Sequence, residues 1–250
     1  MKDQWDFLEV EVKVIPRPPY DRIVRIAQSV APPGFRMIRK PHVAFFDLYF
    51  DSANYSLARG GAYLRVRFDK RSLKRSGKYK LFYKDNPIAK PEDRFLSRRE
   101  VRTDLSLDEL LQYPSGKLPG SAGSLAREVL VRKCGDTNLK PVCVVSTFRR
   151  YFTMHSDDES KTDCMNVSLE QSTALRASDF DVEKLLRTGY IDAPIDAPTY
   201  DFELSEAELT VDDSEEANNA FRALVDALDK EYGVVTWSKY RECLRWLKLH

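Results

Sequence analysis

The stretch Leu8-Glu9-Val10-Glu11-Val12-Lys13-Val14 alternates apolar and charged residues, which is the period of a β-strand. Its apolar row can pack under neighbouring elements, while Glu9, Glu11 and Lys13 share the opposite face and must meet water or a polar interior. An exposed edge strand with protective charges has the same pattern. The stretch therefore predicts a strand, and the rest of the chain must decide where its charges point.

Further segments alternate in the same way, and in most of them one row is apolar and the other is charged. The predicted strands cover residues 42–51, 61–68, 78–84, 97–103, 142–153, 164–170 and 201–211. Amphipathic patterns predict helices over residues 20–30, 105–111, 121–133, 182–187 and 214–232, the last between Asp213-Ser214 and Gly233. The pattern favours an α+β, mainly β fold: a closed antiparallel barrel of about eight strands with flanking helices.

Composition narrows the class of protein. The chain has 250 residues, 42% of them hydrophobic and 32% charged, and we expect one domain over residues 1–250. Its net charge of +1 gives no bulk attraction to nucleic acid, so no DNA partner is expected. No apolar run is long enough to cross a bilayer and the N-terminus does not resemble a signal peptide, so we expect a cytoplasmic protein without a membrane partner. The four cysteines lie singly, which favours reduced thiols over a zinc site.

The charged rows allow two arrangements. A flat sheet that buries its apolar row under helices would expose a broad charged face to water. A closed barrel would instead place the charged rows in a central tunnel. The tunnel acids would be Glu9, Glu11, Glu100, Glu170, Glu206 and Glu208, and the bases Lys13, Arg65, Arg67, Lys80, Lys84, Arg98 and Arg149.

A tunnel of this kind predicts a highly charged ligand, because an ion removed from water costs several kcal/mol unless it is partnered. A polyphosphate chain requires both signs: lysine and arginine bind phosphate oxygens, whereas carboxylates hold divalent metal ions that bridge to the phosphates. An E-x-E pair on one strand face is a sensible half-site for Mg²⁺ or Mn²⁺.

Several motifs in order resemble the CYTH superfamily, the triphosphate tunnel metalloenzymes, over about residues 7 to 240. The matching segments are Glu9-Val10-Glu11-Val12-Lys13, Tyr49-Phe50-Asp51, Leu64-Arg65-Val66-Arg67, Phe82-Tyr83-Lys84, Arg98-Arg99-Glu100, Thr147-Phe148-Arg149, Ser168-Leu169-Glu170, Glu206-Ala207-Glu208-Leu209 and Ser238-Lys239-Tyr240. The resemblance implies an eight-stranded antiparallel tunnel, dependence on a divalent metal and action on triphosphate compounds.

By this resemblance, the catalytic residues would be Glu9, Glu11, Lys13 and Glu100. Phosphates would be held by Lys13, Arg65, Arg67, Lys84, Arg149 and Lys239, to which the strand pattern adds Lys80 and Arg98. The metal ligands would be Glu9, Glu11, Glu170, Glu206 and Glu208.

The leading hypothesis is metal-dependent hydrolysis of inorganic triphosphate by a metal-positioned water. The alternatives are a thiamine triphosphatase, an adenylate cyclase, or a polyphosphate-binding module without catalysis. Two departures keep the last alternative open: Arg102 stands where the family often has a second acid, and Thr147 replaces a frequent basic residue. The pattern leaves open the oligomeric state and any organic group on the triphosphate.

Overall fold

The computed structural model describes residues 4–17, 19–69, 79–85, 96–113, 118, 120–134, 138–158, 163–209 and 215–249. Side chains are described for all of these except residues 4–9, 96, 97, 121, 133 and 134. The predicted cap Asp213-Ser214 lies outside the described residues.

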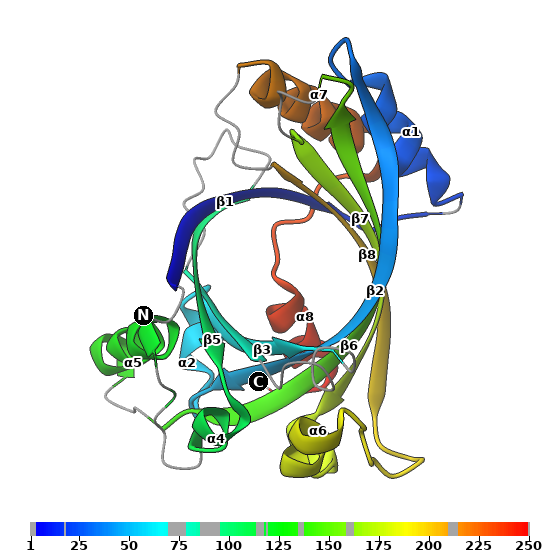
Figure 1. The fold of residues 1–250 in the computed structure, drawn as a ribbon. Helices are drawn as coiled ribbons and strands as arrows, with labels where there is room; N and C mark the ends of the chain where they lie inside the picture. Colours follow the sequence, from blue (N-terminus) through cyan, green and yellow to red (C-terminus); the bar gives the residue numbers. More distant parts are fainter. Residues whose placement is uncertain are drawn as a thin grey trace.

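The described residues form eight antiparallel strands, which together make one strongly curled sheet (Figure 1). The strands are β1 (Gln4–Val14), β2 (Phe35–Asp51), β3 (Tyr63–Phe68), β4 (Tyr79–Lys84), β5 (Leu96–Leu105), β6 (Lys140–Ser156), β7 (Met165–Arg176) and β8 (Thr199–Leu209). Neighbours pair in the order β1-β5-β4-β3-β2-β6-β7-β8, and β8 pairs with β1. The expected mainly β, antiparallel architecture with helices is confirmed.

The first strand joins the two sides of the sheet by two staggered ladders. β1 pairs with β5 from Gln4 to Glu11 and with β8 from Val10 to Val14, so only Val10 and Glu11 belong to both ladders. On β8 the ladder with β1 begins at Ser205, and within the described residues the preceding half-strand, Thr199–Leu204, pairs with β7 alone. The sheet closes on itself through β1, but its wall is open along the first half of β8.

Helices cover the outer, apolar faces of the strands. The helices within the described residues are α1 (Asp21–Ser29), α2 (Ser56–Arg59), α4 (Leu107–Leu110), α5 (Gly120–Cys134), α6 (Val182–Thr188), α7 (Glu215–Tyr232) and α8 (Lys239–Trp246), with a 3₁₀ turn η2 (Ala177–Asp179), and all of them except α8 lie outside the ring of strands (Figure 1). α5 packs on β3, β4 and β5, whereas α7 packs on β1 and β8 with α1 beside it. α7 ends as predicted, since Gly233 follows it with a φ of +73°, in the left-handed region that favours glycine.

The last helix behaves differently, because α8 lies within the ring of strands (Figure 1). The ring of Tyr240 stacks on that of Tyr49 with the centroids 4.8 Å apart, and Cys243 and Leu244 are fully buried around it. The barrel interior is therefore not uniformly charged: an apolar plug fills one part and leaves a polar chamber beside it.

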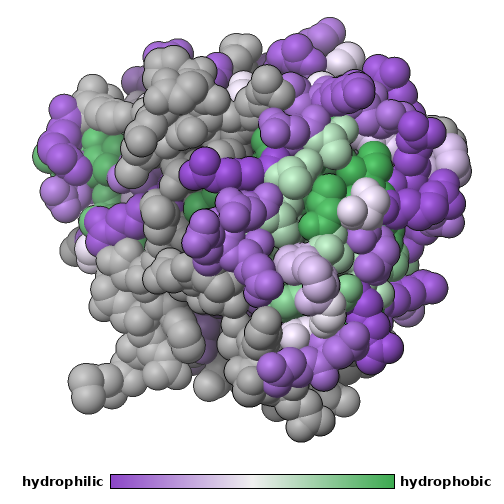
Figure 2. Space-filling view, turned by 90° about the horizontal axis from the view of Figure 1, so that it is seen from above, coloured by the Kyte–Doolittle hydropathy of each residue, from purple (hydrophilic) through white to green (hydrophobic). Residues whose placement is uncertain are grey.

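The outer surface of the molecule is polar over most of the face at the α1–α7 end (Figure 2). Seen from the α1–α7 end, it is mostly hydrophilic, with hydrophobic residues gathered mainly in one area (Figure 2). Within the described residues, no helix combines the length and apolar character needed to cross a bilayer.

Candidate active site

Alternate residues of the strands point inward and surround a cavity of about 320 Å³. Its lining is strongly basic, with eight lysine or arginine side chains and four glutamates. The bases are Lys13, Arg65, Arg67, Lys80, Lys84, Arg102, Arg149 and Lys239, and the acids are Glu11, Glu100, Glu206 and Glu208. An excess of fixed cations in a partly enclosed space favours an anionic ligand.

Glu11 on β1 is held by two buried cations. Its carboxylate contacts Lys13 Nζ, and Oε1 lies 3.2 Å from Nη2 of Arg98. Burial acts to raise the pKa of Glu11, but the positive charges of Lys13, Lys84 and Arg98 outweigh it and lower the pKa to about 2. Glu11 is therefore ionised at any physiological pH.

A second group ties β6, β7 and β8 to α8. The fully buried Glu170 contacts both Arg149 and Lys239, and Glu206 lies 3.3 Å from Nη2 of Arg149 and 3.7 Å from Nζ of Lys239. Burial again acts to raise the pKa of Glu206, but Lys239, Lys13 and Arg149 together hold it well below its usual range. This group fixes the head groups of two cations that line the cavity.

Asp47 anchors the two arginines of β3. It is completely buried, with its carboxylate oxygens accepting hydrogen bonds of 2.7 Å from Nε and Nη2 of Arg67 and one of 3.2 Å from Nη1 of Arg65. The guanidinium of Arg67 also lies 4.0 Å from the centroid of Phe45. Both arginines are therefore held in place before any ligand arrives, with the Nε of Arg65 lacking a hydrogen-bond partner among the described residues.

Glu100 on β5 joins Lys84 to Arg102. The distances are 3.0 Å to Nζ of Lys84 and 3.2 Å to Nη2 of Arg102. Burial opposes ionisation of Glu100, but Lys84 and Arg65 prevail and lower its pKa. The guanidinium of Arg102 lies 4.8 Å from the centroid of Phe82.

Glu208 differs from the other lining acids, because no described residue forms a hydrogen bond or ion pair with its carboxylate. Burial raises the pKa of Glu208, and repulsion from Glu11, Glu100 and Glu206 adds to this against the attraction of Lys84. Its negative charge is only partly compensated in the ligand-free protein, so this position favours an incoming cation.

The structure brings most of the predicted site residues together in one cavity. The predicted residues that line it are Glu11, Lys13, Arg65, Arg67, Lys80, Lys84, Glu100, Arg149, Glu206, Glu208 and Lys239. Arg98 and Glu170 point inward but are buried behind the lining, where they hold other charged side chains. The side chain of Glu9 lies outside the described residues, and its backbone pairs with that of Arg98.

Sequence reasoning missed two charged residues of this region, Asp47 and Arg102. Asp47 precedes Tyr49 and Asp51 in the same strand phase, and that phase is the signal that could have found it. Arg102 was noted only as a departure from the family pattern, yet its side chain lines the cavity. Thr147, the other departure, is buried and hydrogen-bonds to Ser172 Oγ at 3.0 Å.

Comparison with known proteins gives one family. The model of the CYTH domain matches residues 7–233. No curated protein matches the chain.

Solved structures with the same fold include two candidate nucleotide cyclases. A candidate adenylate cyclase from Bacillus halodurans is 15% identical, with a TM-score of 0.52 and coverage of 95% of this chain and 97% of that one. The candidate adenylyl cyclase HpAC1 from Hippeastrum, described as having a dominant triphosphatase activity, is 16% identical, with a TM-score of 0.51 and coverage of 93% of each chain.

Proposed function

Because this chain belongs to the CYTH family, we propose that it is a divalent-metal-dependent triphosphatase that cleaves inorganic triphosphate to pyrophosphate and phosphate inside the barrel. The observation that carries this proposal is the lining itself, in which lysine and arginine outnumber glutamate two to one. The triphosphatase activity described for HpAC1 makes hydrolysis the first reaction to test.

The basic side chains would bind the phosphate oxygens. We assign this role to Lys13, Arg65, Arg67, Lys80, Lys84, Arg149 and Lys239, all of which line the cavity. Arginine contacts phosphate with two parallel N–H donors, and the anchoring by Asp47 presents Arg65 and Arg67 in a fixed orientation. Arg98 would act indirectly, by keeping Glu11 ionised and in place.

The acidic side chains would hold Mg²⁺ or Mn²⁺. Among the described residues, no three His, Cys, Asp or Glu side chains lie close enough together to hold a metal ion without rearrangement. Glu208 nevertheless fits one, because it is a hard oxygen donor with a poorly compensated charge beside Glu11 and Glu206. Glu9 shares the strand face of Glu11 and would complete this set. A bound divalent ion would neutralise phosphate charge and make a bound water more acidic.

In the ligand-free protein, most of the acids in the cavity are paired with its cations, and Glu208 is the exception among the described lining acids. Arg149, Lys13 and Lys239 contact glutamates that would otherwise be buried and uncompensated. Phosphate oxygens would bind the remaining donors of the lining cations, while Glu206 keeps the head group of Arg149 oriented and Glu100 keeps that of Lys84 oriented.

The test is phosphate release by the purified protein from inorganic triphosphate, ATP and thiamine triphosphate, each with Mg²⁺, Mn²⁺ or EDTA. We expect metal-dependent release of one phosphate from inorganic triphosphate. Glu208→Gln keeps the shape of the side chain but removes its charge, so it should reduce turnover about 100-fold. Glu183→Gln, which removes an exposed acid on α6, is the matched control and should leave turnover unchanged.

Product analysis separates the alternatives. Cyclic nucleotide and pyrophosphate from ATP would indicate a cyclase, as named for the Bacillus halodurans protein, and preference for thiamine triphosphate would indicate an organic subsite. Tight triphosphate binding without turnover in any metal would leave a binding module. Full turnover in EDTA, or by Glu208→Gln, would contradict the proposed metal role.

A further inference from the structure

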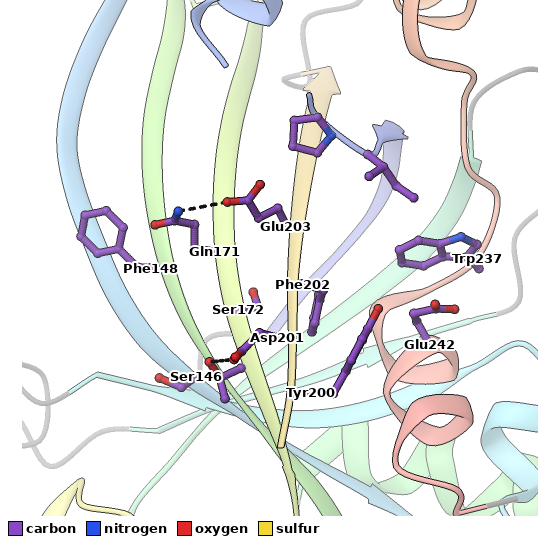
Figure 3. A pocket seen from close by; sticks show the side chains of 13 residues that line it. Ser146, Phe148, Gln171, Ser172, Tyr200, Asp201, Phe202, Glu203, Trp237 and Glu242 are labelled. Atoms are coloured by element: carbon purple, nitrogen blue, oxygen red, sulfur yellow. Dashed lines mark hydrogen bonds between the residues drawn. The ribbon is translucent and has the colours of Figure 1, made fainter. Parts of the chain in front are cut away.

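A second cavity lies beside the open part of the barrel wall, at the first half of β8. It has a volume of about 780 Å³ and runs from the outer face of β6, β7 and β8 around the free edge of β8 towards α8 (Figure 3). Because Thr199–Leu204 pairs with β7 alone among the described residues, one side of its backbone remains available for strand pairing.

The lining of this second cavity is opposite in charge to that of the barrel interior. It contains three acids, Asp201, Glu203 and Glu242, and no lysine or arginine. It also contains the aromatic side chains of Tyr200, Phe202 and Trp237, which a ligand can contact. A polyphosphate is therefore excluded here, and a cationic ligand is favoured.

Two of the acids form hydrogen bonds with neutral groups and no ion pair among the described residues. Asp201 accepts a hydrogen bond from the hydroxyl of Thr173. Glu203 accepts one from the amide of Gln171 (Figure 3) and another from the hydroxyl of Tyr20, so all three donors are neutral. No described cation forms an ion pair with Asp201 or Glu203, whereas Glu242 is paired with Arg245 at 2.6 Å. Asp201 is exposed and Glu203 is half-buried.

The two kinds of side chain alternate along β8. Asp201 and Glu203 lie on one side of the strand, and Tyr200 and Phe202 on the other (Figure 3). A strand added at this edge would also alternate, so basic residues would face the two acids while apolar residues faced the aromatic rings.

We propose that the free edge of β8 binds an extended segment of a partner protein by strand addition, and that this segment alternates basic and apolar residues. Backbone hydrogen bonds to the edge would supply affinity, and the acidic and aromatic rows would supply specificity. A second copy of this edge is disfavoured as the partner, because Asp201 and Glu203 of both copies would repel each other.

The test measures binding of a fluorescent peptide of about six residues, the length that spans Thr199–Leu204, made of alternating lysine and valine. Fluorescence anisotropy with the full-length protein should show saturable binding that weakens with added salt. A peptide with a central proline lacks one backbone donor and cannot extend the sheet, so it should bind at least about tenfold more weakly. A glutamate–valine peptide should not bind.

Variants locate the site. Asp201→Asn/Glu203→Gln should weaken binding about tenfold, as expected for the loss of two exposed charge contacts. Asp192→Asn/Asp196→Asn removes the same charge from an exposed loop and should have no effect. No binding of the lysine–valine peptide would overturn the proposal. Equally tight binding of the proline peptide would also overturn it, because the peptide would then bind without strand addition. Equally tight binding of the lysine–valine peptide by the Asp201/Glu203 variant would overturn it as well, because the peptide would then bind elsewhere.

Discussion

The acidic side chains of the barrel interior fall into two groups, according to whether the protein supplies their counter-charge. Glu11 and Glu206 are held by buried cations that lower their pKa values, whereas the pKa of Glu208 is raised by burial and by its acidic neighbours. Glu208 therefore destabilises the ligand-free protein while it is ionised. A position that costs stability is expected where a ligand supplies the missing charge.

This difference predicts opposite effects of two similar substitutions. Because the folded-state pKa of Glu208 lies above its unfolded value, ionisation disfavours folding, so Glu208→Gln should raise the unfolding midpoint in EDTA at neutral pH. This gain in stability should disappear below the pKa of Glu208 in the unfolded chain, where the side chain is neutral in both the folded and the unfolded state. Urea unfolding at neutral and acidic pH measures both effects.

Glu206→Gln is the paired comparison. It leaves Lys239, Lys13 and Arg149 without one of their counter-charges, and it should destabilise the protein by about 3 kcal/mol. Equal effects of the two variants would mean that the charge environments of Glu206 and Glu208 do not differ.

The alternating pattern identified which residues face the barrel interior, but it could not distinguish those that line the cavity from those buried behind the lining. Arg98 and Glu170 share the phase of the lining residues, yet both are buried behind them, because side chains from adjacent strands compete for the same interior space. The pattern did not identify Asp47, because its strand is rich in aromatic residues and has no clear charged row. Only the pairing of this strand with β3 shows that Asp47 faces Arg65 and Arg67.

Among the elements, the plug helix α8 depends on one carboxylate. Asp51, at the end of β2, accepts hydrogen bonds from the backbone N–H groups of Ser52, Leu57 and Ala58 at 2.7 to 3.1 Å, which fixes α2. The same carboxylate accepts a bond of 3.0 Å from the hydroxyl of Tyr240. One buried side chain thereby connects a short outer helix to the interior plug.

Removing the hydroxyl should loosen this connection. Tyr240→Phe keeps the stacking on Tyr49 but leaves Asp51 without one donor, so the free energy of unfolding should fall by about 1 kcal/mol. Tyr190→Phe, at an exposed ring, should change it by less than about 0.5 kcal/mol. Denaturant unfolding compares the two, and equal midpoints would show that the hydroxyl contributes nothing.

Sequence predicted all eight strands and the outer helices α1, α4, α5, α6 and α7, because their apolar and polar residues repeat with a clear period. It missed the short helix α2 and the first part of β2, residues 35–41. It did not predict α8 as a plug. The partners of this helix, Tyr49 and Asp51, lie far from Tyr240 along the chain, and periodicity reports local structure only. The open half of β8 was also missed, since it follows from the stagger of two ladders.

At the scale of the whole molecule, the charged interior predicts sensitivity to acid. The pKa values of Glu11, Glu100 and Glu206 lie below their unfolded values, so each stabilises the fold above about pH 4.5. Each contribution is lost as the pH falls through the folded-state pKa, which for Glu11 is about 2. Thermal unfolding in EDTA should show a falling midpoint across this interval. Glu11→Gln should be less stable at neutral pH but should show a flatter profile, and an identical profile would contradict the assignment.

The two ladders of β1 also constrain how the barrel can form. The first strand of the chain pairs with the last, Lys13 opposite Glu206, so the ring is completed only by contacts between residues very distant in sequence. Such contacts slow folding, because a long loop must be ordered before they form. During synthesis β1 is made before β8, so the ladder between these two strands cannot form until β8 has been made. Until β8 is made, one edge of β1 stays unpaired, and such an edge favours aggregation of the incomplete chain.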